Sequence, residues 1–162
     1  MKQTFIIRAA RADDAFSVGA LARQFADYLR RLGDTSEFRL TAEAYLRDGF
    51  GERPAFAGFV AEENGRVVGY LLYHFGYDSD RAARTLDIAD LYVEEARRHQ
   101  GVGRALMNHA AEIARQAGAE DLVWAVFHSN DLATRFYERL GAHQIHDIFL
   151  MRLPARIPED RI

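Results

Sequence analysis

Two glycines and a group of basic side chains lie between an apolar, β-prone stretch and an amphipathic helical pattern. Glycines leave backbone N–H groups accessible, and a helix N-terminus adds N–H donors and a partial positive charge. The sequence therefore predicts a site for an anion, with phosphate as the expected ligand. The residues of this predicted loop are Arg98, His99, Gln100, Gly101, Val102, Gly103 and Arg104.

Two common phosphate-binding patterns do not fit this loop. It has no Gly-Lys-Ser/Thr, so it is not a Walker A loop, and the third glycine of a dinucleotide fingerprint would fall at Leu106. The pattern Arg-x-x-Gly-x-Gly, which starts at Arg98, resembles the acetyl-CoA pyrophosphate loop of the GCN5-related N-acetyltransferases. A short glycine pattern also occurs in ordinary strand–helix turns, so the surrounding sequence has to decide.

A second pattern lies downstream at the spacing that this family uses. Asn-x-x-Ala-x-x-Phe-Tyr-x-x-x-Gly, from Asn130 to Gly141, resembles the family's second motif. Upstream, residues 47–54, 59–62 and 68–70 are similar to the spermidine/spermine and thialysine N-acetyltransferase branch. The resemblance covers most of the chain, and the chain is identified as a member of this family.

The resemblance implies acetyl-CoA as co-substrate, with no need for a metal. In the family, the pantetheine arm pairs with the end of the central strand, the asparagine of the second motif contacts that arm, and its tyrosine is the general acid. The glycine loop holds the pyrophosphate. Carried onto this chain, the cofactor-binding positions outside the loop are Leu91, Tyr92, Val93, Asn130, Ala133, Phe136 and Tyr137.

The chain departs from the branch at two acidic positions. The branch usually has a glutamate before the aspartate of the central strand, where this chain has Ala89 followed by Asp90. Its first helix usually carries Tyr-Glu, where this chain has Tyr28-Leu29. Two carboxylates that would bind a polycation are therefore missing. The predicted acceptor-binding residues are Tyr28, Asp87, Ala89 and Asp90.

Acetyl transfer to an amine requires a base and an acid. Asp90 or Asp87, directly or through water, is the candidate that removes the amine proton, and Tyr137 can protonate the departing sulfur. Strand alternation places Asp87 on the face of Ala89, and Asp90 on the opposite face unless a bulge intervenes. Simpler roles remain open: Asp90 as a structural acceptor and Tyr137 as a core aromatic. The aromatic residues at 70–77 either form sheet core or line the acceptor site.

Composition narrows the classes of function. The chain has 162 residues, a net charge of −3 and no cysteine. This length predicts one domain over residues 1–162, with a frayed tail at 154–162. The charge does not favour nucleic acid or a membrane surface, and the lack of cysteine excludes a thiol nucleophile. No long apolar segment is present, so we expect a cytoplasmic protein.

The order of predicted elements gives the fold class. It is an α/β (α+β) fold with a mixed central sheet, a splayed pair formed by the fourth and fifth strands, and flanking helices, as in the acetyltransferase family. A loop is predicted at residues 76–84. Helices are predicted at 15–32, 41–49, 101–116 and 130–140, and strands at 4–8, 56–63, 67–75, 85–93, 122–127 and 145–153.

The predicted function is transfer of an acetyl group from acetyl-CoA to a primary amine of a small molecule. Two alternatives remain open: a protein or peptide N-acetyltransferase, and a degenerate module that binds acetyl-CoA without turnover. The branch resemblance also implies a homodimer. Residues 145–153 are apolar enough to pair with a second copy.

Overall fold

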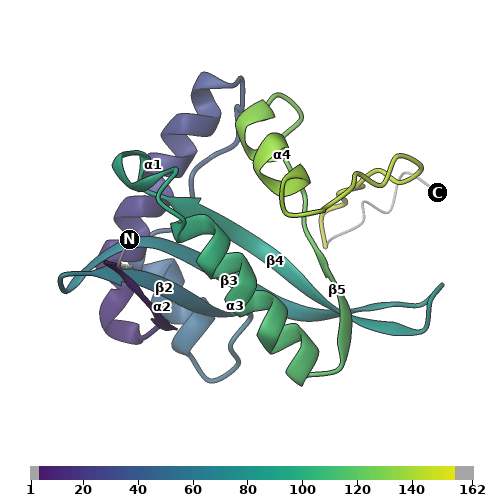
Figure 1. Cartoon of the computed structure of the whole chain (residues 1–162), viewed down its shortest axis with the longest axis horizontal. Coiled ribbons are helices and arrows are strands. Elements are labelled where there is room, and N and C mark those ends of the chain that lie inside the picture. The colour runs from purple at the N-terminus through teal and green to yellow at the C-terminus, as the bar shows by residue number, and fades with distance from the viewer. Residues whose placement is uncertain (1–3, 156–162) are drawn as a thin grey trace. The chain divides into compact units, whose positions relative to one another are not determined.

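The computed structural model describes residues 4–155, and its central element is a five-stranded sheet with the strand order β1-β2-β3-β4-β5 (Figure 1). The first four strands are antiparallel neighbours, and β5 runs parallel to β4. This mixed sheet confirms the predicted fold class. The strands are β1 Ile6–Ala9, β2 Ala57–Glu63, β3 Arg66–Asp78, β4 Ala83–Val93 and β5 Ala119–Val123.

The chain divides into two compact units, Met1–Asn130 and Asp131–Ile162. The sheet belongs to the first unit, together with α1 Ala15–Arg31, α2 Ala42–Phe50 and α3 Val102–Gln116. The second unit contains α4 Asp131–Glu138. Short 3-10 turns span Ala12–Asp14 and Glu95–Arg97.

The first unit has apolar packing on both faces of its sheet. On one face, α1 and α2 pack over a core that includes Tyr45, Tyr70 and Tyr92. On the other face lies α3 (Figure 1). Its His109 ring meets the Phe59 ring edge-on at a centroid distance of 4.4 Å. Burial of these apolar surfaces is the main force that holds the helices on the sheet.

Local sequence explains where several elements begin and end. The Thr41 side chain accepts a hydrogen bond from the Ala44 N–H at 3.2 Å and so caps α2. Asn64 and Gly65 have φ values of 51° and 77°, the backbone of a tight two-residue turn between β2 and β3. Both features match the predicted helix start and hairpin.

A bulge interrupts the pairing of β3 with β4. Leu72 lies opposite Asp90 and Tyr73 lies opposite Ile88, so Ala89 has no partner across the ladder. An extra residue resets the alternation of side chains. Asp87 and Asp90 therefore lie on the same face of the sheet, the one covered by α1 and α2. The structure therefore contains the bulge that is needed to bring Asp87 and Asp90 onto one face.

The parallel strands β4 and β5 separate along their length. β5 pairs with β4 only from Arg84, opposite Ala119, to Asp87, opposite Val123. The rest of β4, up to Val93, continues without β5 as a neighbour (Figure 1). This is the predicted splayed pair, and it leaves backbone groups on one edge of β4 accessible to a ligand.

Two predicted boundaries around the central strands were wrong. Residues 76–78 belong to β3, and β4 begins at Ala83, so the predicted loop shrinks to residues 79–82. Pairing between the two long strands extends them into polar sequence. The predicted strand at 122–127 ends at Val123, because β4 offers no partner beyond that point.

The predicted last strand was also wrong. In residues 145–153 the structure contains no strand, and the side chains of Ile148, Phe149 and Leu150 are exposed. The structural reason given for a homodimer is therefore lost. Of the predicted frayed tail, residues 156–162 lie outside the described residues. Within residues 4–155, no helix combines the length and apolar character needed to cross a bilayer.

Candidate active site

The predicted phosphate loop connects the end of β4 to α3. His99 and Gly101 have left-handed φ values of 61° and 87°, and Gly101 is the N-cap residue of α3. The N–H of Ala105 donates to the Gly101 carbonyl at 2.9 Å. The N–H groups of Val102 and Gly103 precede that bond and have no carbonyl one turn back. The loop therefore presents the N–H donors that an anion requires.

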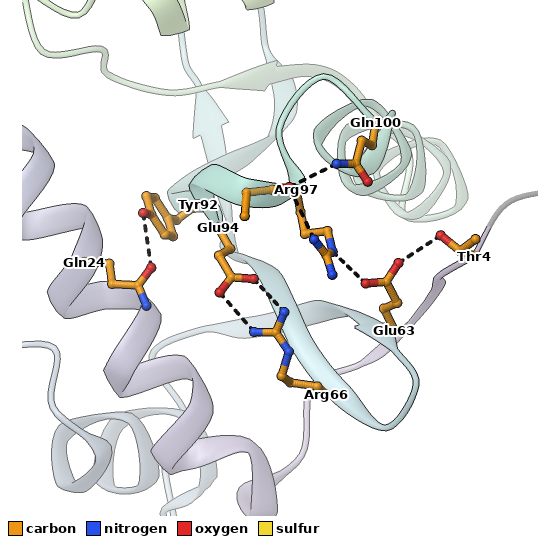
Figure 2. A network of polar contacts seen from close by, with 9 residues as sticks. Thr4, Gln24, Glu63, Arg66, Tyr92, Glu94, Arg97 and Gln100 are labelled. Atoms are coloured by element: carbon orange, nitrogen blue, oxygen red, sulfur yellow. Dashed lines mark hydrogen bonds and ion pairs between the residues drawn. The ribbon is translucent and has the colours of Figure 1, made fainter.

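Ion pairs from the β2–β3 hairpin hold the segment before this loop. The Arg97 Nε atom donates to Glu63 at 2.6 Å, and two Arg66 nitrogens donate to the Glu94 carboxylate at 3.0 and 2.8 Å. The Gln100 side chain donates to a backbone carbonyl at 3.0 Å (Figure 2). Arg97 is thus engaged by Glu63, and Arg66 offsets the charge of Glu94.

The Arg98 side chain lies against two tyrosine rings. Its guanidinium carbon is 5.0 Å from the Tyr28 ring centroid and 5.4 Å from that of Tyr92, at cation–π distance. Its Nε atom donates to the Val93 carbonyl at 3.2 Å. The Tyr28 hydroxyl in turn donates to Asn130 at 2.8 Å. The structure thus brings these five predicted site residues together, while Arg104 is exposed.

Asp90 lies beside a buried hydroxyl. The Tyr70 O–H donates to the Asp90 Oδ2 atom at 2.6 Å, and Tyr70 is fully buried. Burial raises the pKa of Asp90 to about 6, although hydrogen bonds from Tyr70 and from the Leu91 N–H oppose this shift. A carboxylate of this kind can accept a proton near neutral pH. Ala89, at the bulge, is exposed.

A second polar group lies further along the same face. The Thr85 hydroxyl donates to Asp87 at 2.6 Å, and the His74 Nδ1 atom is 3.9 Å from the other Asp87 oxygen. A side chain at Gly76 would overlap the Asp87 carboxylate, so glycine makes room for it. The carboxylate is one-third exposed and can reach a ligand.

A pocket of about 340 Å³ lies beside Tyr92 in the first unit. Two of its acids already have basic partners, since Asp27 pairs with Arg30 at 2.6 Å and Glu94 pairs with Arg66. Its walls thus carry charges of both signs, three acids and one arginine. The lining residues are Gln24, Asp27, Arg31, Tyr92, Glu94, Glu95 and Ala96.

The remaining predicted site residues belong to the second unit. Ala133, Phe136 and Tyr137 all lie on α4. The rings of Phe136 and Tyr137 have centroids 5.1 Å apart. The place of Tyr137 near a thioester sulfur stays a prediction, as does the lack of need for a metal. Within the described part of the chain, no three His, Cys, Asp or Glu side chains are grouped as metal ligands.

The sequence did not single out several residues that shape this region. The sequence marks Tyr70, which donates a hydrogen bond to Asp90, only as one member of the aromatic stretch at 70–77. Glu63 and Arg66 flank a hairpin turn and gave no chemical signal. The hint that was available is the alternation of β3, which places Tyr70 and Leu72 on one face. Only the register between β3 and β4, in which Leu72 lies opposite Asp90, shows that Asp90 shares that face.

Comparison with known proteins gives a consistent result. Residues 20–142 match the acetyltransferase (GNAT) family. The chain is similar to thialysine N-epsilon-acetyltransferase of Bos taurus, with 34% identity over 148 residues that cover 86% of this chain and 85% of that protein. It is also similar to aminoalkylphosphonate N-acetyltransferase of Salmonella typhimurium, with 33% identity over 147 residues that cover 91% and 90% of the two chains.

Solved structures share the fold. An integron cassette protein from V. cholerae superposes with a TM-score of 0.76 at 22% identity, covering 94% of this chain and 93% of the other. An aminoglycoside acetyltransferase from an uncultured soil sample gives a TM-score of 0.70 at 20% identity, covering 93% and 97%. At these identities the likeness concerns the fold alone.

Proposed function

Because the chain belongs to the acetyltransferase (GNAT) family and is therefore an acetyl-CoA-dependent N-acetyltransferase, we propose that it acetylates a primary amine of a small molecule by direct attack. One observation carries the proposal. The open edge of β4 leads into a glycine-capped helix N-terminus, with the hydrogen bond from the buried Tyr70 to the half-buried Asp90 on the adjoining sheet face. The β4 edge suits the thioester, the helix N-terminus suits the pyrophosphate, and Asp90 suits the amine.

The proposed reaction assigns one role to each group. Asp90 takes a proton from the ammonium, and the freed nitrogen bonds to the thioester carbonyl carbon. A backbone N–H at residues 91–93 polarises that carbonyl. The carbon–sulfur bond breaks as Tyr137 protonates the sulfur, and the proton lost by the new amide nitrogen returns to Tyr137. The products are the N-acetylated amine, free CoA and one proton, which Asp90 releases to the solvent.

Acetyl-CoA binding depends on close approach of phosphate to the backbone of the loop. Gly103→Val places a branched side chain in the first turn of α3, so we expect the Kd of acetyl-CoA to rise by about tenfold or more. Isothermal titration calorimetry measures the change. Ala105→Val is the matched control, because the Ala105 N–H already bonds inside the helix. Equal affinity of the folded Gly103→Val protein and wild type would refute the loop assignment.

The acceptor we propose is a small or amino-acid-like amine rather than a polyamine. Ala89 and Leu29 stand where the branch has acids, and two acids of the pocket are paired with arginines. A polycation would find few free carboxylates for charge-assisted hydrogen bonds. The names of the two relatives, which refer to thialysine and to aminoalkylphosphonate, also indicate small acceptors that combine an amine with an acidic group.

A panel of acceptors tests this proposal. We expect lysine-like amino acids and aminoalkylphosphonates to give a kcat/KM at least about tenfold above that of spermine, since each lost charge-assisted hydrogen bond costs roughly 1.5–3 kcal/mol. Thiol release from acetyl-CoA reports turnover. The protein has no cysteine, so it adds no thiol signal of its own. Spermine turnover at the level of the best amino acid would contradict the proposal. Acetylation of peptides alone would instead support the protein-modifying alternative.

The remaining parts of the proposal rest on the resemblance and on composition. They are a homodimer, one domain over residues 1–162, and a cytoplasmic location. Binding of acetyl-CoA without turnover of any amine would favour the degenerate module, in which the absence of an acid at Ala89 reflects lost chemistry.

A further inference from the structure

We propose that Tyr70 is a positioning residue that orients the Asp90 carboxylate and sets the pH range over which Asp90 accepts the amine proton. The inference rests on the proposed role of Asp90 as base. Its geometric basis is a 2.6 Å hydrogen bond from a fully buried hydroxyl on β3 to one carboxylate oxygen on the neighbouring strand. In the regular part of the ladder Tyr70 lies opposite Tyr92 and Leu72 lies opposite Asp90, so Tyr70 and Asp90 share a face of the sheet.

The hydrogen bond fixes which oxygen of Asp90 is available. Tyr70 donates to Oδ2, so the Tyr70 hydroxyl does not occupy Oδ1, and this oxygen is the one proposed to receive a proton from an amine or a water. The ring of Tyr70 lies in the core between β3 and the helices α1 and α2, which prevents it from turning away. A carboxylate held in this way has one orientation, so less conformational entropy is lost when it contacts the amine.

Tyr70 also controls the charge of Asp90 without exchanging a proton with it. Burial and the nearby negative charge of Asp90 raise the pKa of Tyr70 well above its usual value, so the hydroxyl remains a donor at all working pH values. A donor that bonds the charged form of a carboxylate lowers its pKa. Without that bond, burial alone would keep Asp90 protonated to a higher pH, and fewer molecules would hold a free base near neutrality.

Other titratable groups on this face do not replace Tyr70. Burial and two hydrogen bonds account for the pKa of Asp90, and no charged side chain among the described residues contributes to its shift. The groups that line the face are Tyr92, Asp87 and Thr85 from β4, His74 from β3, Tyr28 from α1, Tyr45 from α2, and Arg98, which stacks on Tyr28 and Tyr92.

The test compares Tyr70→Phe with wild type in two measurements. The first is the pH profile of kcat/KM for the best acceptor. The second is an NMR titration of the Asp90 carboxyl carbon in protein labelled with ¹³C-aspartate, assigned with Asp90→Asn. We expect the acidic limb of the profile and the NMR pKa to move up together by about one pH unit or more. Activity of Tyr70→Phe should then rise again above the shifted limb, to a plateau below that of wild type, because the orienting hydrogen bond is lost.

Tyr73→Phe is the matched control. Tyr73 is also buried on β3 but lies on the opposite face, where its ring stacks on Phe59 at 5.1 Å. We expect no movement of either titration. A second variant covers poor folding of Tyr70→Phe, since Asp90→Asn removes the buried charge. In the Asp90→Asn background, Tyr70→Phe should change activity by less than about twofold, because a residue that acts through Asp90 has nothing left to orient.

Each outcome has one meaning. An unchanged NMR pKa in Tyr70→Phe would overturn the inference, whatever the activity. A shifted NMR pKa with an unmoved kinetic limb would overturn the catalytic part, because Asp90 would then titrate without serving as the base. Absence of turnover in wild type with every amine would refute the proposed function. The NMR titration would still measure the Tyr70–Asp90 coupling in that case.

Discussion

Tyr137→Phe should lower kcat by roughly 10²–10⁴-fold while the KM for acetyl-CoA stays close to its wild-type value. The departing CoA thiolate needs a proton in the transition state, and a phenol with a usual pKa near ~10 can supply it. Removal of the hydroxyl leaves the ring, which packs beside Phe136 at a centroid distance of 5.1 Å. Steady-state kinetics with saturating amine, supported by circular dichroism, measure the effect.

The matched control for Tyr137→Phe is Tyr77→Phe. Tyr77 is an exposed tyrosine near the end of β3, and loss of its hydroxyl should leave kcat within about twofold of wild type. The general-acid role fails if folded Tyr137→Phe protein turns over at the wild-type rate. Water or CoA itself would then carry the proton, and Tyr137 would serve packing alone.

Asp90→Asn should change activity and stability in opposite directions. Loss of the base should lower kcat by roughly 10²-fold or more. At neutral pH the same substitution should raise the free energy of unfolding, because it removes a buried charge. An asparagine oxygen can still accept the Tyr70 hydrogen bond. Active sites often keep groups that cost stability.

The pKa shift of Asp90 determines how the stability difference between Asp90→Asn and wild type depends on pH. Burial raises the pKa of Asp90 from its ordinary 3.8 to about 6, so between these values the folded protein holds a proton that the unfolded chain has released. Stability of wild type therefore falls as pH rises through this window. Asp90→Asn lacks that loss, and its advantage above pH 6 should reach up to about 3 kcal/mol.

Urea unfolding at several pH values measures the difference. We expect the two stability curves to converge below pH ~4, where both forms are neutral, and to separate as pH rises. A lower stability of Asp90→Asn at neutral pH would mean that the carboxylate is a structural anchor. In that case the simpler reading of Asp90 as a hydrogen-bond acceptor would be correct.

Features set by neighbouring residues in the chain could be predicted from the sequence. The hairpin at Asn64 and Gly65, the cap at Thr41 and the strand–loop–helix around Gly101 depend on local backbone chemistry. Each was located close to its position in the structure. The family motifs added the identity of the co-substrate, which composition and spacing alone could not give.

Features that depend on distant partners could not be predicted. Tyr70 and Asp90 are twenty residues apart, and their contact depends on the register between β3 and β4, which no local pattern fixes. The ion pair of Arg97 with Glu63 spans 34 residues and depends on where the hairpin ends. An apolar stretch likewise becomes a strand only beside a partner strand, which residues 145–153 do not have within the described chain.

Because Ala89 has no partner on β3, a substitution at this position should disturb β4 less than a deletion would. Its exposed side chain could be exchanged for a larger one at little cost to the sheet, which makes this position a natural place to redesign acceptor preference. Deletion of Ala89 would restore the regular pleat, and the side chain of either Asp87 or Asp90 would then point to the opposite face of the sheet. Libraries that vary this strand should therefore exchange residues and never shorten it.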